Sequence, residues 1–208
     1  MIKKNEIYLI VKISIYITIM VGIFNFLYGT ALDLNFALKS ASYGVTISLA
    51  FWGIFFSAGW KWYPLKWLIN RPNLNGTWEG SLTSNWQDGS GNGVGPKKIF
   101  VVIRQTFLSI HFVTFTDTFI GTSYAETLVI DKERGVLKAI YVYRKESSDY
   151  SVEAEYQGVS ELRILEPNAS KMEGKFWTSI KTDGGMQLVK LNRNTIATYA
   201  QGLSLIAQ

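Results

Sequence analysis

At positions 70–80 the chain reads Asn70-Arg71-Pro72-Asn73-Leu74-Asn75-Gly76-Thr77-Trp78-Glu79-Gly80, and this stretch divides a lipid-like N-terminal third from a water-facing remainder. Pro72 cannot continue a helix and biases Arg71 away from helical backbone angles, so it predicts a helix end. From Leu74 to Leu82, apolar or small residues alternate with polar ones, as a half-buried strand requires. We therefore expect a membrane helix, a linker over residues 70–73 and then a first strand.

Two apolar runs precede this stretch. Residues 7–27 carry one charge, Lys12, and residues 41–60 carry none. Each run can cross a hydrocarbon core of roughly 30 Å at about 1.5 Å per residue. A signal peptide is the competing interpretation of the first run, since the small residues at 29–31 resemble a cleavage site. Its apolar core is too long for that, and a second span would remain, so we expect a transmembrane helical hairpin within residues 1–69.

Basic residues flank the hairpin at both of its ends. Lys3 and Lys4 precede the first span, while Lys61, Lys66 and Arg71 follow the second. Positive residues next to spans favour the cytoplasmic side of a membrane. We therefore expect both termini, and the whole C-terminal part, to lie in the cytoplasm.

Beyond the linker, short alternating runs are separated by turn residues, which is an all-β pattern. The expected strands occupy residues 74–85, 97–106, 108–116, 122–130, 136–145, 155–165, 171–180 and 186–193. Eight strands with short connections favour a lipocalin-like, antiparallel up-and-down β-barrel over residues 74–193, because closing the first strand onto the last removes both edges. Such a barrel either fills with side chains or holds one small ligand. Residues 194–208 form a frayed tail or a short packing helix.

The charged residues of the seventh strand must face water, and this assigns the two faces of the barrel wall. The inward positions of that strand are then Met172, Gly174, Phe176, Thr178 and Ile180. On the fifth strand the same alternation turns Leu137, Ala139, Tyr141 and Tyr143 toward the lumen.

Catalysis has little support in these residues. The chain has no cysteine, which excludes thiolate nucleophiles and Cys-based metal sites. Its single histidine, His111, gives little support to a His-based metal site or a Ser-His-Asp triad. The glycine-rich segment at residues 87–96 lacks the Gly-Lys-Ser/Thr ending of a phosphate-binding loop. We predict no enzyme activity, no metal and no cofactor. The net charge is +5, but the lysines and arginines are scattered among acidic residues instead of forming a block. We therefore expect no polynucleotide partner.

Binding of a small ligand is better supported. The candidate ligand-binding residues are Arg104, Tyr141, Tyr143, Thr178, Lys190 and Trp78, with Trp86 as a further aromatic. Aromatic rings can stack on nucleobases, and a basic side chain can bind a phosphate. Each residue also has a structural interpretation, since tyrosines fill barrel cores and Trp78 can close the floor.

The tripeptide Gly76-Thr77-Trp78 resembles the Gly-x-Trp start of lipocalins. The whole layout of two spans, the linker over residues 71–80 and a β-rich domain ending near residue 193 resembles the SMODS-associated two-transmembrane β-strand-rich effectors of CBASS antiphage operons. The resemblance covers nearly the full chain. It implies a bacterial inner-membrane protein whose cytoplasmic barrel senses a cyclic dinucleotide made by a CD-NTase after phage infection. It also implies that the ligand drives oligomerisation, membrane disruption and abortive infection.

The resemblance assigns no individual ligand residue to this chain. An alternative function stays open, namely a membrane-tethered lipocalin-like carrier of an apolar small molecule. Polar and basic groups in the lumen would favour the nucleotide receptor, whereas a wholly aliphatic lumen would favour the carrier.

Overall fold

The computed structural model describes residues 4–28, 34–63, 65–69, 71–87, 91, 93, 95–131, 134–147, 155–165 and 169–207. The chain forms two compact units. The first comprises Met1–Arg71 together with Thr106–Leu108, and the second comprises Pro72–Gln105 with Ser109–Gln208.

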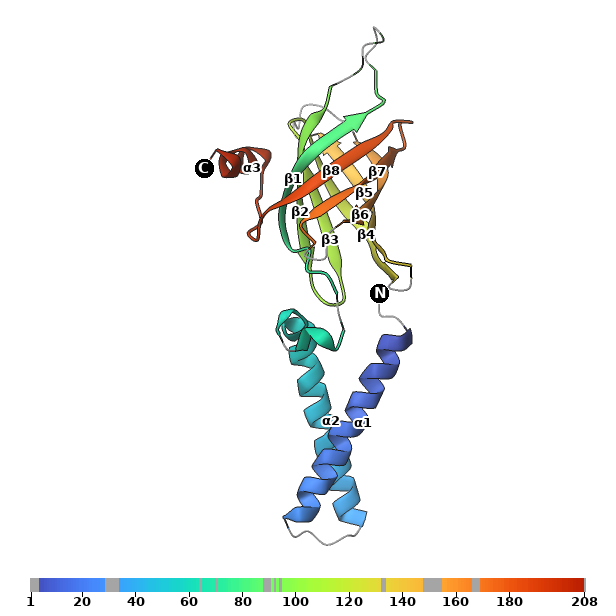
Figure 1. Cartoon of the computed structure of the whole chain (residues 1–208), viewed down its shortest axis with the longest axis vertical. Helices are drawn as coiled ribbons and strands as arrows, with labels where there is room; N and C mark the ends of the chain where they lie inside the picture. The colour runs from blue at the N-terminus through green and yellow to red at the C-terminus, as the bar shows by residue number, and fades with distance from the viewer. Residues whose placement is uncertain are drawn as a thin grey trace. The chain divides into compact units, whose positions relative to one another are not determined.

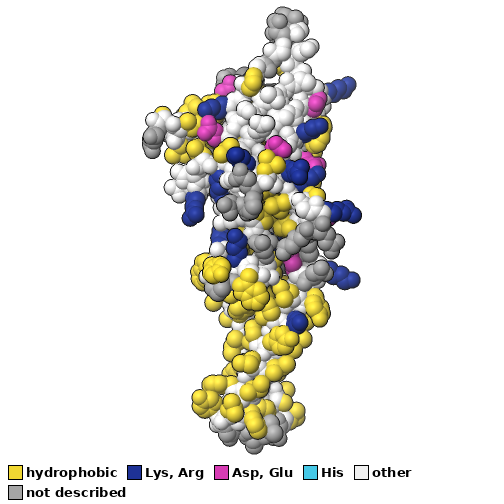
Figure 2. Space-filling model, viewed as in Figure 1, with side chains coloured by type: hydrophobic (Ala, Val, Ile, Leu, Met, Phe, Trp, Pro, Cys, Tyr) yellow, Lys and Arg dark blue, Asp and Glu magenta, His cyan; other side chains and the backbone are white. Residues whose placement is uncertain are grey.

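The first unit contains a helical hairpin of α1 (Lys4–Leu27) and α2 (Leu34–Ser57), which lie side by side in Figure 1. Two short 3-10 helices follow, η1 (Gly59–Lys61) and η2 (Leu65–Trp67). Both α-helices are long and apolar enough to cross a membrane. On the face shown in Figure 2, mostly apolar side chains cover the hairpin, whereas charged side chains gather over the barrel.

The second helix starts earlier and ends earlier than the apolar run at residues 41–60 predicts. Residues 34–40 lie before that run and would belong to the connection between the two spans, yet they form the first turns of α2. Packing against α1 supports this extension, since the Asn25 amide donates to the Ser40 hydroxyl at 3.0 Å. Further along, a Cβ at Gly44 would lie 2.6 Å from the Thr18 hydroxyl oxygen. The glycine therefore permits close approach of the two helices.

Arg71, expected as a membrane-flanking charge, is instead buried within the first unit. Its guanidinium forms an ion pair with Glu6 at 2.7 Å. It also lies over the ring of Phe107 at 4.1 Å and donates to the Phe107 carbonyl oxygen at 2.5 Å. An ion pair removed from water needs such additional hydrogen bonds, because desolvation of both charges is costly.

The second unit is a closed antiparallel barrel in which each strand pairs with the next and β1 pairs with β8. Its strands are β1 (Gly76–Ser84), β2 (Lys97–Gln105), β3 (Ile110–Phe115), β4 (Phe119–Asp131), β5 (Val136–Ser147), β6 (Glu155–Ile164), β7 (Lys171–Thr178) and β8 (Asp183–Asn192). The predicted eight-stranded up-and-down barrel is therefore confirmed. β3 begins two residues later than expected, because Thr106–Leu108 belongs to the first unit.

The lumen is filled by inward-facing apolar side chains over most of its depth. They come from all around the wall and include Trp78, Val101, Phe112, Tyr141, Leu162, Met172 and Leu188. The inward assignments on β5 and β7 are confirmed, with one exception. Ile180 was expected in the lumen, but β7 ends at Thr178 and Ile180 lies half exposed in the following turn.

The C-terminal segment forms the short packing helix α3 (Tyr199–Ile206), drawn at the C-terminal end in Figure 1. Thr198 caps it by accepting a hydrogen bond from the Gln201 amide at 3.2 Å. A Cβ at Gly202 would lie 2.5 Å from the ring of Phe100. Phe100 projects from the outer face of β2 and is nevertheless fully buried. The helix therefore covers an apolar patch on the outer wall.

Candidate functional site

The barrel is open at the end where β1, β3, β5 and β7 finish and β2, β4, β6 and β8 begin. A hollow of about 610 Å³ lies at this mouth. It is lined by Leu82, Ser84, Trp86, Gly95, Lys97, Thr116, Asp117, Thr118, Phe119, Tyr143, Lys145, Ser147, Tyr156, Phe176, Thr178, Ile180 and Thr182. Small-ligand sites in proteins typically measure about 300–1,000 Å³ and combine apolar walls with a few polar groups. The barrel mouth has this size and composition.

Strand alternation places the two lysines at the mouth. On β5 the inward positions run through Tyr141 and Tyr143, and the next inward residue is Lys145. On β2 the inward Ile99 and Val101 are preceded by Lys97. Each strand is therefore apolar inside the barrel and becomes basic where it reaches solvent.

Lys145 is held between two aromatic rings. Its Nζ lies 4.5 Å from the ring centroid of Phe119 and 5.3 Å from that of Tyr156. These rings meet edge to face at 5.4 Å. Burial, and secondarily the nearby Lys97, lower the pKa of Lys145 from 10.5 to about 8, against the opposing effect of Asp117. Among the described residues, Lys145 forms no ion pair within 4 Å, so an anionic ligand would stabilise its charged form.

Lys97 differs from Lys145 because a carboxylate already faces it. Its Nζ lies 3.8 Å from the Asp117 carboxylate across the rim. Both side chains are substantially exposed, so this ion pair contributes little to stability. An incoming phosphate could therefore replace the carboxylate at Lys97 with little loss of folding free energy.

Hydroxyl groups line another part of the mouth. The Thr178 and Thr182 hydroxyl oxygens lie 2.5 Å apart, and Thr178 also accepts from the Thr182 amide at 3.2 Å. This threonine pair fixes the turn that closes β7 onto β8. It also offers hydrogen-bonding groups at the edge of the hollow.

Below the mouth, two hydroxyls are fully buried without a hydrogen bond of normal geometry. Tyr141 and Ser160 lie opposite each other in the β5–β6 pair, and among the described residues neither hydroxyl makes a hydrogen bond of normal geometry, although the two lie close enough to affect each other. Burial raises the pKa of Tyr141 to about 12, with the Ser160 hydroxyl acting in the opposite direction. The Tyr141 ring stacks on Phe112 at 4.2 Å. The phenol is therefore neutral and rigidly placed beneath the hollow.

Ligand binding at the mouth should depend on pH through Lys145. Among the described residues, the charged groups that affect the pKa of Lys145 are Lys97 and Asp117. Burial raises the pKa of Tyr156, so that phenol stays neutral near pH 9. An anionic ligand stabilises the charged form, so binding above pH 8 requires proton uptake. We expect the affinity for an anionic ligand to fall about tenfold between pH 7 and pH 9. Calorimetry across this range would measure it, and Lys145→Arg should show a flat profile. A flat profile in the parent protein would contradict the prediction.

The structure brings only part of the predicted residue set together. Tyr143 and Thr178 line the mouth, as does Trp86, and Tyr141 lies directly below them. Trp78 and Lys190 lie at the opposite end of the barrel. There the Trp78 ring nitrogen donates to the Leu74 carbonyl oxygen at 2.9 Å, and Lys190 lies 5.5 Å from the centroid of the Trp78 ring. Arg104 is exposed on the outer wall, beside His111 of β3.

The principal residues that the sequence interpretation missed are Lys97, Asp117, Phe119, Lys145 and Tyr156. For the two lysines a signal existed, because extending the inward alternation of β2 and β5 by one step reaches both. For Asp117 and Phe119 it did not, because they occupy the β3–β4 connection and the start of a strand that was expected only from residue 122.

A closed eight-stranded barrel with a ligand-sized, aromatic and basic mouth is a small-ligand receptor fold, here preceded by two helices apolar enough to span a membrane. The family model described as "Cap15, cyclic dinucleotide receptor domain" matches residues 69–190. The chain belongs to this family, which is a receptor family and not an enzyme family. Among the described residues, no cluster of side chains suited to holding a metal ion is found.

Two relatives are similar in sequence to most of this chain. A CD-NTase-associated protein 15 from Escherichia albertii is 27% identical over 173 residues, which cover 81% of this chain and 86% of that protein. A protein of the same name from Staphylococcus schleiferi is 25% identical over 155 residues, covering 72% of this chain and 78% of that protein. Both alignments are longer than the 122 residues that the family match at 69–190 spans.

Proposed function

We propose that the barrel mouth binds a cyclic dinucleotide. The observation that carries this proposal is the position of Lys145, which lies at the mouth between two aromatic rings. A cyclic dinucleotide carries two phosphodiester anions and two aromatic bases in a compact ring. The mouth offers Lys145 and Lys97 as cations, with Phe119 and Tyr156 as adjacent aromatic faces. Base stacking on such rings contributes about 1–3 kcal/mol per base. Charge and ring content therefore match between ligand and site.

The lysines and the aromatic rings take different parts of the ligand. The ammonium groups of Lys97 and Lys145 bind the phosphodiesters, because both point into the same hollow. A base enters along Tyr143 and the rings beside Lys145. The threonine pair at Thr178 and Thr182 then hydrogen-bonds to base edges or ribose hydroxyls, which gives selectivity in addition to affinity.

The proposal extends to the effector role in CBASS antiphage defence. Ligand binding favours an oligomeric state of the chain, and the clustered α1–α2 hairpins disrupt the bacterial inner membrane, which causes abortive infection. The ligand can shift this equilibrium only through a higher affinity for the assembled state. Lys61 and Lys66 flank the second apolar helix, and this supports a cytoplasmic barrel with both termini on that side.

Calorimetric titration of the full chain in lipid nanodiscs tests the ligand assignment. A panel of cyclic dinucleotides is compared with the corresponding linear dinucleotides and with long-chain fatty acids. We expect saturable binding of at least one cyclic member and weaker binding of its linear counterpart, since a preformed ring loses less conformational entropy. Retention of fatty acids with no response to any cyclic dinucleotide would instead support a carrier of apolar molecules.

A further inference from the structure

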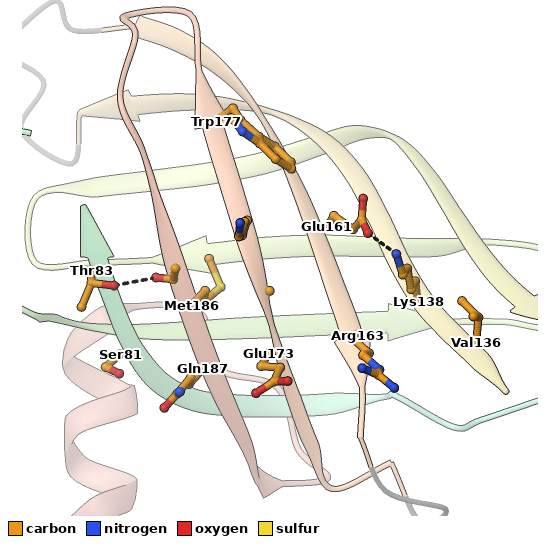
Figure 3. A pocket seen from close by; sticks show the side chains of 13 residues that line it. Ser81, Thr83, Val136, Lys138, Glu161, Arg163, Glu173, Trp177, Met186 and Gln187 are labelled. Atoms are coloured by element: carbon orange, nitrogen blue, oxygen red, sulfur yellow. Dashed lines mark hydrogen bonds and ion pairs between the residues drawn. The ribbon is translucent and has the colours of Figure 1, made fainter. Parts of the chain in front are cut away.

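The outer wall of β6 and β7 is a second surface with an ordered pattern of side chains. It lies along a hollow of about 870 Å³ on the outside of the barrel, seen from close by in Figure 3. Trp177, Glu161, Arg163 and Glu173 are labelled there, on the two adjacent strands. None of them lines the ligand hollow at the mouth.

Three cross-strand pairs form a ladder along this wall. Glu173 lies opposite Arg163, Lys175 lies opposite Glu161, and Trp177 lies opposite Val159. The first two rungs each join opposite charges, and the third joins two apolar side chains. The wall therefore carries a defined sequence of acidic, basic and apolar positions on each of two neighbouring strands.

Much of this pattern is not used within the chain itself. Glu161 forms an ion pair with Lys138 of β5 at 2.5 Å, and not with Lys175, which lies opposite it on β7. Among the described residues, neither Arg163 nor Glu173 takes part in an ion pair at 4 Å or less, although they face each other across the strands. Trp177 is 46% exposed and Val159 36% exposed. A large aromatic and unpaired charges on one rigid sheet face are typical of an interaction surface.

Symmetry identifies the partner that would fit. Consider two copies of this wall packed face to face about a twofold axis that runs parallel to the strands, midway between β6 and β7. The axis places β6 of one copy over β7 of the other at the same height. A residue on β7 therefore faces, in the second copy, the same β6 residue that it pairs with in its own chain. Glu173 then meets Arg163 of the second copy, Lys175 meets Glu161, and Trp177 meets Val159. Every rung is complementary under this one operation, as an isologous contact requires.

From this complementarity we propose that the β6–β7 outer wall is a self-association surface that binds a second copy of this chain. The proposal rests on the proposed function in one respect: the proposed function includes an oligomeric state, and this wall is the surface through which it would form. The wall around the hollow carries Lys138, Arg163 and Lys175 against Glu161 and Glu173. Because these charges nearly cancel, the wall fits another copy of itself better than a polyanion or an anionic lipid surface.

A charge exchange tests the surface directly. The full chain in detergent micelles is examined by analytical ultracentrifugation, with and without a cyclic dinucleotide. We expect Arg163→Glu to weaken association at least tenfold, because the new carboxylate would face Glu173 of the second copy. The double variant Arg163→Glu with Glu173→Arg should restore association to within about threefold, since the pair is only reversed. Arg104→Glu, on the outer wall of β2 and outside this hollow, is the matched control.

An independent measurement uses the absence of native cysteine. Chains carrying Val159→Cys are mixed with chains carrying Trp177→Cys and mildly oxidised. We expect a disulfide-linked dimer that contains one chain of each kind, in excess of dimers from either chain alone. Circular dichroism confirms that each variant is folded.

The outcomes separate this surface from the ligand site. The proposed surface is contradicted if the double variant associates as weakly as Arg163→Glu, or if Arg163→Glu associates as strongly as the parent. It is also contradicted if the parent shows no association. In each case calorimetry still decides whether the mouth binds a cyclic dinucleotide, because no substituted residue lines it.

Discussion

The Lys145→Met variant is expected to bind the cyclic dinucleotide about 30- to 100-fold more weakly than the parent chain. Methionine has a similar length and can keep the contacts with Phe119 and Tyr156, so the substitution removes the charge and little else. A hydrogen bond or ion pair to a partly desolvated charge contributes about 2–3 kcal/mol, which corresponds to this loss. Calorimetric titration at pH 7 measures the change in Kd.

Two further observations decide whether the charge itself is responsible. Lys145→Arg keeps the charge and should retain affinity to within about tenfold, since its guanidinium also binds phosphate but is larger. Lys145→Met should unfold at the same temperature as the parent or higher, because it no longer buries a cation. Equal affinity of Lys145→Met and the parent would contradict a role for this residue in binding phosphate.

Strand periodicity explains how much of this site could be predicted from the sequence. Alternation identified the inward face of β5 and β7, and with it Tyr141, Tyr143 and Thr178 near the mouth. The alternation does not say at which end of the barrel a residue lies. Trp78 and Lys190 are inward or near-inward residues of β1 and β8, yet they lie at the opposite end from the mouth.

The depth of a residue depends on strand register and on the closure of β1 against β8, which a periodic pattern does not contain. β1 meets β8 with an irregularity between Thr77 and Trp78, and this shift sets the height of Trp78 against Lys190. Burial and Arg193 lower the pKa of Lys190, whose amine donates to the Asn73 carbonyl oxygen at 3.0 Å. This lysine therefore closes the lower end of the barrel together with Trp78.

The accuracy with which the ends of the membrane helices could be predicted was limited by a different physical cause. Hydropathy stopped the second span short of Lys39, although a charged side chain at the end of a helix can extend toward water. The buried Glu6–Arg71 pair also escaped prediction, because it joins residues 65 positions apart. Fold class follows from local patterns, whereas such pairs depend on tertiary packing.

Replacing Gly174 with alanine is expected to destabilise the barrel by about 3 kcal/mol or more. A Cβ at Gly174 would lie 1.8 Å from the Glu161 backbone carbonyl oxygen, so β6 and β7 would have to separate where they are paired. Backbone cannot move aside as a flexible side chain can. For a domain of this size the loss corresponds to a melting temperature lower by roughly 10 °C.

Gly185→Ala is the matched control on the neighbouring strand. Gly185 lies opposite Lys175 on β8, and its added Cβ would meet only the Thr83 hydroxyl at 3.4 Å and the Gly174 carbonyl oxygen at 3.9 Å. We expect a change within about 0.5 kcal/mol, because alanine also restricts the unfolded chain. Thermal unfolding followed by circular dichroism compares the two variants. Equal melting temperatures would show that close approach of β6 and β7 at Gly174 does not limit the stability of the barrel.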